Sequence, residues 1–234
     1  MSWAEQGVAD VRHLSYGAYS MGHPPGPSGR DDLLDAAERL IAARGVHGVS
    51  LRQIGAAAGA RNNSAAQYHF GDRAGLVRAI FERRMGPLDE RRLAILSDRP
   101  DPDLPALVRA LVDPLASTVS EQVEGSWYVR FLDELLRESS LGQLLTVETP
   151  YNRGLRRILH LIGEHLDGRS PTERDEVIEL ATALAVRGFA DFERKRDRGL
   201  RPPDLTVDVV AELISESSLG VLTARAIEPH RATA

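Results

Sequence analysis

Apolar residues along this chain recur at intervals of three and four, which is the spacing of one face of an α-helix. No segment shows a sustained alternation of apolar and polar residues, so a β-sheet is not expected. Three of the helical faces are Leu107, Val108, Leu111, Val112, Leu115 and Val119; Trp127, Tyr128, Phe131, Leu132, Leu135 and Leu136; and Leu155, Ile158, Leu159, Ile162 and Leu166. The pattern predicts an all-α fold.

Two short helices joined by a tight turn are predicted after residue 50. Ser50 is suited to cap a helix that begins at Leu51, and Gly59 can end that helix in a left-handed turn. The second helix should begin at about Asn62 or Asn63 and end at His69, and Asp72 can cap a third. This order of elements predicts a helix-turn-helix unit.

The second short helix carries outward-facing side chains that can form hydrogen bonds, which suits a helix lying in the major groove of DNA. Arg52 and Arg73 flank that helix and are expected to face phosphates. The residues predicted to contact DNA are Arg52, Gln53, Arg61, Asn62, Asn63, Ser64, Gln67, Tyr68, His69 and Arg73. The alternative is a plain helical hairpin whose polar face meets water.

Charge favours the DNA-binding interpretation. The whole chain has a formal net charge of −5, but residues 44–84 carry seven arginines against Asp72 and Glu82. A basic region on an acidic protein is typical of a module that approaches phosphates. All basic residues except Lys195 are arginines, which can form two parallel hydrogen bonds to a phosphate.

A family resemblance rests on the helix-turn-helix stretch Ser50–Arg73 together with the helix DDLLDAAERLIAAR over Asp31–Arg44, the linker GVHGVS over Gly45–Ser50, and the run YHFGDRAGLV. Together they resemble the N-terminal domain of the tetracycline-repressor (TetR) family of transcriptional regulators, from about Leu33 to Phe81. The resemblance implies a dimer that binds a palindromic operator, usually as a repressor, and is released by a small molecule. Two departures are a turn one residue longer than usual and an aromatic residue, Tyr68, displaced by one position.

The sequence predicts three parts. Residues 1–29 are rich in Gly, Ser and Pro toward their end and are expected to form a flexible arm, either a plain tail or a segment that enters the minor groove. Residues 30–85 form the helix-turn-helix domain, and a helix break at residues 85–87 separates it from a helical domain over residues 86–234.

Two long helices are expected at the end of the chain. Ser170, Pro171 and Glu173 form a strong start signal for a helix that ends at about Arg196, and another is predicted over Asp204–Leu222. Their apolar faces either close the protein's own core or form a four-helix dimer interface, which the resemblance implies. The interface residues are predicted to be Val177, Ala181, Leu184, Leu213 and Ile214.

An aromatic cluster is the candidate effector site. Large rings with polar tips can line a pocket for a small organic molecule, although rings at helical spacing also occur as plain core. The predicted pocket residues are Trp127, Tyr128, Phe131, Tyr151 and His160. His160 and His165 are otherwise expected at the surface, and the Asp133-Glu134 pair beside Arg130 and Arg137 is expected to form solvated ion pairs.

The sequence contains no motif that is typical of an enzyme active site. There is no Gly-x-Ser-x-Gly, no phosphate-binding glycine loop and no His-Glu-x-x-His, and the absence of cysteine excludes disulfides and thiolate metal sites. No signal peptide or membrane span is recognisable, so a cytoplasmic protein without a cofactor is expected. The main hypothesis is a ligand-responsive DNA-binding regulator; the alternatives are a helical ligand-binding or adaptor protein that no longer reads DNA, and an all-α enzyme.

Overall fold

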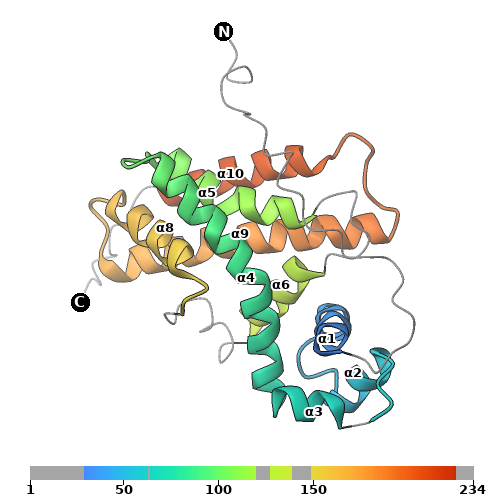
Figure 1. Cartoon of the computed structure of the whole chain (residues 1–234). Helices are drawn as coiled ribbons and strands as arrows, with labels where there is room; N and C mark the ends of the chain where they lie inside the picture. The colour runs from blue at the N-terminus through green and yellow to red at the C-terminus, as the bar shows by residue number, and fades with distance from the viewer. Residues whose placement is uncertain (1–28, 63, 120–126, 139–148, 225–234) are drawn as a thin grey trace, which may run out of the picture.

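The computed structural model describes residues 29–62, 64–119, 127–138 and 149–224, and all regular structure within these residues is helical (Figure 1). The elements are α1 (Arg30–Arg44), α2 (Leu51–Ala57), α3 (Ala65–Phe70), α4 (Arg73–Asp98), α5 (Leu104–Ala116), the 3-10 turn η3 (Ser117–Val119), α6 (Tyr128–Arg137), α8 (Arg153–Glu164), α9 (Pro171–Asp197) and α10 (Val207–Thr223). The all-α class predicted from the sequence is confirmed.

Helices α1, α2, α3 and the start of α4 form the N-terminal unit, which lies at one end of the molecule (Figure 1). Its centre is apolar, because Leu34 of α1, Ile54 of α2 and Ala66 of α3 are each at most 2% exposed. Burial of such side chains is the main force that holds helices this short, since α2 and α3 have too few turns to be stable alone. The unit therefore presents α3 on a packed support.

The start of α3 differs from the prediction. The helix begins at Ala65 rather than at Asn62 or Asn63, because the Asn62 side chain accepts a hydrogen bond from the Ser64 N–H at 2.9 Å and holds these residues in a turn. Asn63 lies outside the described residues.

Helix α4 runs without interruption through the predicted break at residues 85–87, so that prediction was wrong. Pro87 has no N–H to donate, and its ring faces solvent while Met85 and Leu88 on either side are buried. Packing of these two side chains offsets the lost hydrogen bond. The division into domains at residues 30–85 and 86–234 remains a prediction, and a single helix joins the two parts.

The remaining helices pack in a second group. α9 and α10 lie side by side, α5 packs on both, α8 packs on α4 and α5, and α6 lies between α1 and α9. Ser170 and Glu173 form the predicted capping box of α9, whereas α10 begins at Val207 with Thr206 as its cap, three residues later than predicted. Gly188 permits the contact of α9 with α10, because a Cβ there would lie 2.7 Å from Cδ1 of Ile214.

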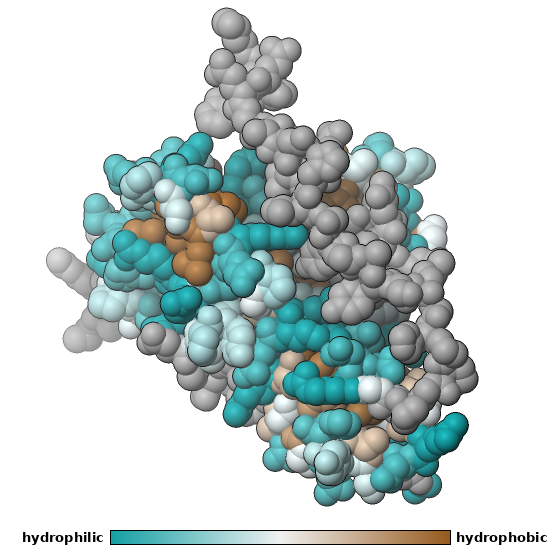
Figure 2. Space-filling model, in the orientation of Figure 1, coloured by the Kyte–Doolittle hydropathy of each residue, from teal (hydrophilic) through white to brown (hydrophobic). Residues whose placement is uncertain are grey.

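The surface in the view of Figure 2 is mainly hydrophilic, with apolar residues gathered most densely near α8 and smaller apolar areas over the N-terminal unit. Across the described residues, none of the helices combines the length and the apolar character needed to cross a membrane.

Candidate functional site

The helix-turn-helix is held by local hydrogen bonds that fix where each helix begins. The Ser50 Oγ accepts from the Gln53 N–H at 3.3 Å, and the Gln53 Oε1 accepts from the Ser50 N–H at 2.8 Å. Asp72 caps α4 by accepting from the Gly75 N–H at 2.8 Å. The predicted caps are thus present, and Gln53, a predicted DNA contact, uses its carbonyl oxygen in the capping box.

The turn between α2 and α3 requires glycine. Gly59 has φ 72°, in the left-handed region, and Gly71 ends α3 with φ 74°. These two residues set the angles at which α3 enters and leaves the unit. As a result, α3 is a short, separately oriented helix rather than an extension of α2 or α4.

Helix α3 divides cleanly into a packed side and an open side. Ala66 and Phe70 are buried, and the Arg30 guanidinium lies 5.4 Å from the centre of the Phe70 ring. Gln67, Tyr68 and His69 are exposed, Tyr68 to 85%. The open side therefore offers an amide, a phenol and an imidazole, all of which can form hydrogen bonds to DNA.

Arginines of the N-terminal unit fall into two groups. Arg52 and Arg61 are exposed on and after α2, together with Arg44 and Arg78. Arg83 and Arg84 are instead turned toward α1, where they pair with Asp35 at 2.6 Å and with the buried Glu38 at 2.7 Å, respectively. The basic surface is accordingly smaller than the sequence count implied, since α1 neutralises two of its arginines.

The phosphate contact of Arg73 remains a prediction, and the structure shows that its side chain also makes contacts within the chain. Its Nη2 donates to the carbonyl oxygen of Val49 at 3.0 Å, and its Nη1 lies 3.2 Å from Nδ1 of His47. The side chain is only half-exposed and joins the start of α4 to the loop before α2. Arg73 therefore supports the geometry of the helix-turn-helix.

The comparison with protein families decides the interpretation of this unit. A family model described as bacterial regulatory proteins, tetR family, matches residues 33–80, which include α1, α2, α3 and the first part of α4. The N-terminal unit is a tetR-family domain. This unit is accordingly that of a DNA-binding transcriptional regulator.

Solved structures agree with the fold over most of the chain. AmtR from Mycobacterium smegmatis has a TM-score of 0.53 and 20% sequence identity, over 88% of this chain and 92% of that chain. The fatty acid degradation regulator FadR from Bacillus halodurans has a TM-score of 0.50 and 16% identity, over 84% of this chain and 100% of that chain. No curated protein matches in sequence. At these identities the similarity shows the fold alone.

Helix α6 connects the tetR-family domain with the rest of the molecule. Glu138 at the end of α6 lies 3.1 Å from Nε2 of His47, and a Cβ at Gly45 would lie 3.4 Å from the Glu134 carboxylate. Both contacts reach the loop that Arg73 also binds. A shift of α6 would therefore displace the loop over residues 45–50, which precedes α2.

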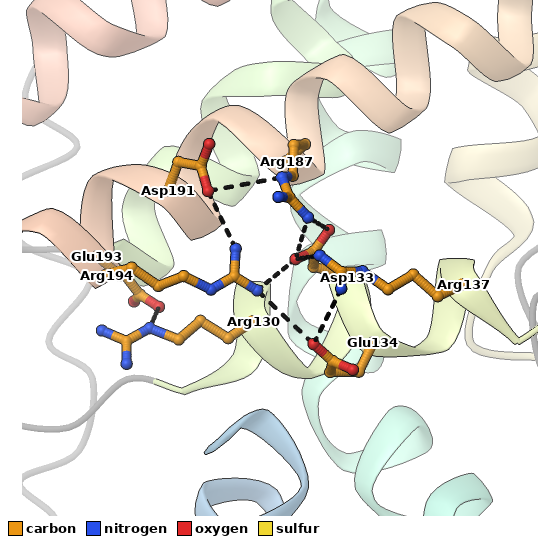
Figure 3. Close-up of polar contacts among 8 residues, drawn as sticks. All are labelled: Arg130, Asp133, Glu134, Arg137, Arg187, Asp191, Glu193 and Arg194. Carbon is orange, nitrogen blue, oxygen red and sulfur yellow. Dashed lines mark hydrogen bonds and ion pairs between the residues drawn. The ribbon is translucent and has the colours of Figure 1, made fainter. Parts of the chain in front are cut away.

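A charged cluster fixes α6 on α9 (Figure 3). The Asp133 carboxylate, 5% exposed, lies 3.1 Å from Arg187 and 3.3 Å from Arg137, and it also accepts from Arg194. The prediction that the Asp133-Glu134 pair would be solvated was wrong for Asp133. A buried carboxylate with three arginines is held strongly, because losing one partner would leave the others uncompensated.

Beside this cluster, Glu193 of α9 is fully buried. Its Oε2 lies 3.3 Å from Nε of Arg130, although the two groups are not aligned as a hydrogen bond. Burial raises the pKa of Glu193 to about 8, while attraction by Arg130 and Arg196 acts in the opposite direction. Sequence patterns did not reveal this residue, since glutamate in a charged helix end usually faces water.

The predicted effector residues come together only in part. Tyr128 and Phe131 are buried, with ring centres 6.1 Å apart, and Trp127 packs under Arg130 with 4.5 Å from the guanidinium to the ring. Tyr151 is 40% exposed, and His160 is exposed and lies 3.5 Å from Glu164. The effector site built on these residues remains a prediction.

The predicted dimer residues also differ in exposure. Ala181 and Ile214 are buried within the chain, Val177 and Leu184 are half-buried, and Leu213 is 53% exposed. Two further apolar residues that the sequence analysis did not name are open to solvent, namely Leu180 at 51% and Val209 at 43%. Their spacing resembles that of core residues, so only the structure distinguishes them.

Proposed function

We propose that this tetR-family protein acts in the cytoplasm as a homodimeric one-component repressor that binds a palindromic operator and is released by a small organic effector. The single observation that carries the DNA-reading role is the open side of α3. Gln67, Tyr68 and His69 project from a helix whose other side is packed, with Arg52 and Arg61 exposed nearby. This is the arrangement needed for a helix that enters the major groove between phosphate contacts.

Exposed apolar residues on the last two helices support the dimer. Leu180 on α9 and Val209 and Leu213 on α10 are each more than two-fifths exposed. Large apolar side chains at adjacent helices gain free energy when a second copy covers them. A two-fold symmetric pair would present two copies of α3 to the two half-sites of a palindrome.

Release would follow from a change in the spacing of the two α3 helices. An effector that binds better to the conformation with the wrong spacing lowers operator affinity by the ratio of its two affinities. The contacts of Glu138 with His47 and of Glu134 near Gly45 support a route from the C-terminal helices to the DNA-binding unit.

The test is selection of DNA fragments by the purified full-length protein, followed by binding measurements at several salt concentrations. We expect enrichment of a palindrome and an affinity that falls steeply with salt. Absence of any enriched sequence would overturn the proposal in favour of a helical adaptor without DNA reading.

A variant pair locates the reading residue. Gln67→Ala should cost about 1–3 kcal/mol on the selected operator and little on unrelated DNA, because an amide reads a base edge. Glu179→Ala, an exposed position on α9, is the control and should change neither. Equal loss on both DNAs for Gln67→Ala would assign the reading role to Tyr68 or Arg61 instead.

A further inference from the structure

Arg92 on α4 is an arginine in a position where arginine is seldom found. Its side chain is 1% exposed, and burial lowers the pKa of its guanidinium from the ordinary value, against attraction by Tyr128 and Asp89. An arginine keeps its charge even so, and a buried ion is costly unless other groups match it. The groups that compensate the charge of Arg92 therefore indicate what this position is for.

The described residues supply few hydrogen-bond acceptors for this guanidinium. Nη1 of Arg92 lies 3.2 Å from the thioether sulfur of Met85, which is a weak acceptor, and Nε finds no hydrogen-bond acceptor among the described residues. A guanidinium has five N–H donors in a planar fork that fits a carboxylate. The acceptors contributed by the described chain fall short of that number.

The nearest acidic residue has its oxygens committed elsewhere. Asp89 is 2% exposed, and its carboxylate accepts from the N–H groups of Gly154 at 2.9 Å and of Leu155 at 2.8 Å, at the start of α8. Gly154 fits closely there, since a Cβ would lie 2.9 Å from the Asp89 carbonyl oxygen and 3.0 Å from Cβ of Arg92. The Asp89 carboxylate thus accepts hydrogen bonds from the free N–H groups in the first turn of α8.

Asp89 thus attracts Arg92 but does not accept a hydrogen bond from it. The guanidinium and the positive end of the α8 dipole meet one carboxylate, and that carboxylate already compensates the helix end. A second carboxylate would give the guanidinium the hydrogen-bond acceptors that the described residues do not supply. The side chains around it are mainly apolar: Met85 touches Arg92 directly, and Tyr128 is stacked on the buried Phe131.

We propose that Arg92, between α4, α6 and α8, binds the carboxylate of a small organic acid whose remaining part is apolar. This inference rests on the proposed function in one respect, because it takes this ligand to be the effector. It makes the effector an anion and assigns its charged group to Arg92, with Tyr128 and Phe131 beside its apolar part. The competing explanation is that water molecules alone satisfy the guanidinium.

The experiment compares acids with their neutral amides on the purified full-length protein. Benzoate is compared with benzamide, and hexanoate with hexanamide, by calorimetric titration and by the shift in unfolding temperature at neutral pH. A charge-assisted contact should make each acid bind about ten- to a hundredfold more tightly than its amide. If neither acid binds more tightly than its amide, water satisfies Arg92 and the proposal is overturned.

Variants locate the charge that is recognised. Arg92→Met removes the charge with an unbranched side chain and should abolish the preference for the acid, while the unliganded protein stays at least as stable as the parent. Should it fail to fold, Arg92→Gln carries the same comparison. Arg157→Met, at an exposed position on α8, is the matched control and should keep the preference. An unchanged preference in the Arg92 variants would show that the anion binds elsewhere.

The two proposals fail separately. Operator binding by the unliganded protein is measured without any acid, and acid binding is measured without DNA. Acid binding to a protein that selects no DNA sequence would retain the Arg92 site and remove the regulator. Operator binding that no acid alters, with acid binding intact, would retain the site and remove its role as the effector site.

Discussion

Glu193 should make this protein less stable as pH rises, and Glu193→Gln should remove that dependence. The carboxyl group has a pKa of about 8 when folded, compared with 4.5 as the ordinary value. Between these two pH values the folded protein holds a proton that the unfolded chain has released. Unfolding therefore becomes more favourable by up to about 1.4 kcal/mol for each pH unit in this window.

The charges around Glu193 set this sign. Arg130 and Arg196 favour the ionised form, while Asp197 and the buried Glu38 of α1 oppose it, and burial is the largest effect. Glutamine has nearly the same shape and carries no charge at any pH. From pH 5.5 to 7.5 the stability of Glu193→Gln should consequently rise relative to the parent by about 2–3 kcal/mol.

Urea unfolding of both proteins at pH 5.5, 6.5 and 7.5, at one protein concentration, measures this difference. Glu179→Gln, at an exposed position on α9, is the control, and its stability should change with pH as that of the parent does. Parallel curves for the parent and Glu193→Gln would refute the reasoning, because they would mean that Glu193 is ionised in the folded protein throughout this range.

Two further predictions concern the DNA-binding unit and the dimer. Arg73→Met should lower the unfolding temperature and weaken operator binding together, since the hydrogen bond to Val49 and the contact with His47 are lost. Weaker DNA binding at unchanged stability, with a salt slope lower by about one, would show instead that Arg73 contacts a phosphate. Leu213→Glu should give a monomer in light scattering by placing a charge in an apolar interface, whereas the same substitution leaving the mass at that of a dimer would exclude this face of α10.

Features set by neighbouring residues were predictable from the sequence. The starts of α2 and α9 followed from Ser50 and from Ser170 with Glu173, because a capping box involves residues three apart. Gly59 at the end of the first short helix was likewise identified, because few other residues adopt its φ. The start of α3 was missed because the Asn62 side chain forms a turn that competes with the helix.

Features set by distant residues were not predictable in the same way. Asp133 looked like half of a local ion pair, but Arg187 and Arg194, which bury it, are on α9. Arg92 lies on the helix face of the buried Met85 and Leu88, but arginine is usually exposed, and only the packing of α4 on α8 shows that it is enclosed. The sequence therefore identified the kind of DNA-reading unit and left its connection to the C-terminal helices open.

Because α4 is continuous, a small bend within it would displace its N-terminal end beside α3. Pro87 is about 14 residues from Arg73, so the segment of helix that ends beside α3 is about 21 Å long. A bend of about 10° where the proline removes a hydrogen bond would move its far end by about 4 Å, which exceeds the ~3.4 Å rise between neighbouring base pairs. Because a rigid arm multiplies a small rotation in this way, a displacement near Arg92 too small to disturb the core would be enough to carry α3 out of step with the groove.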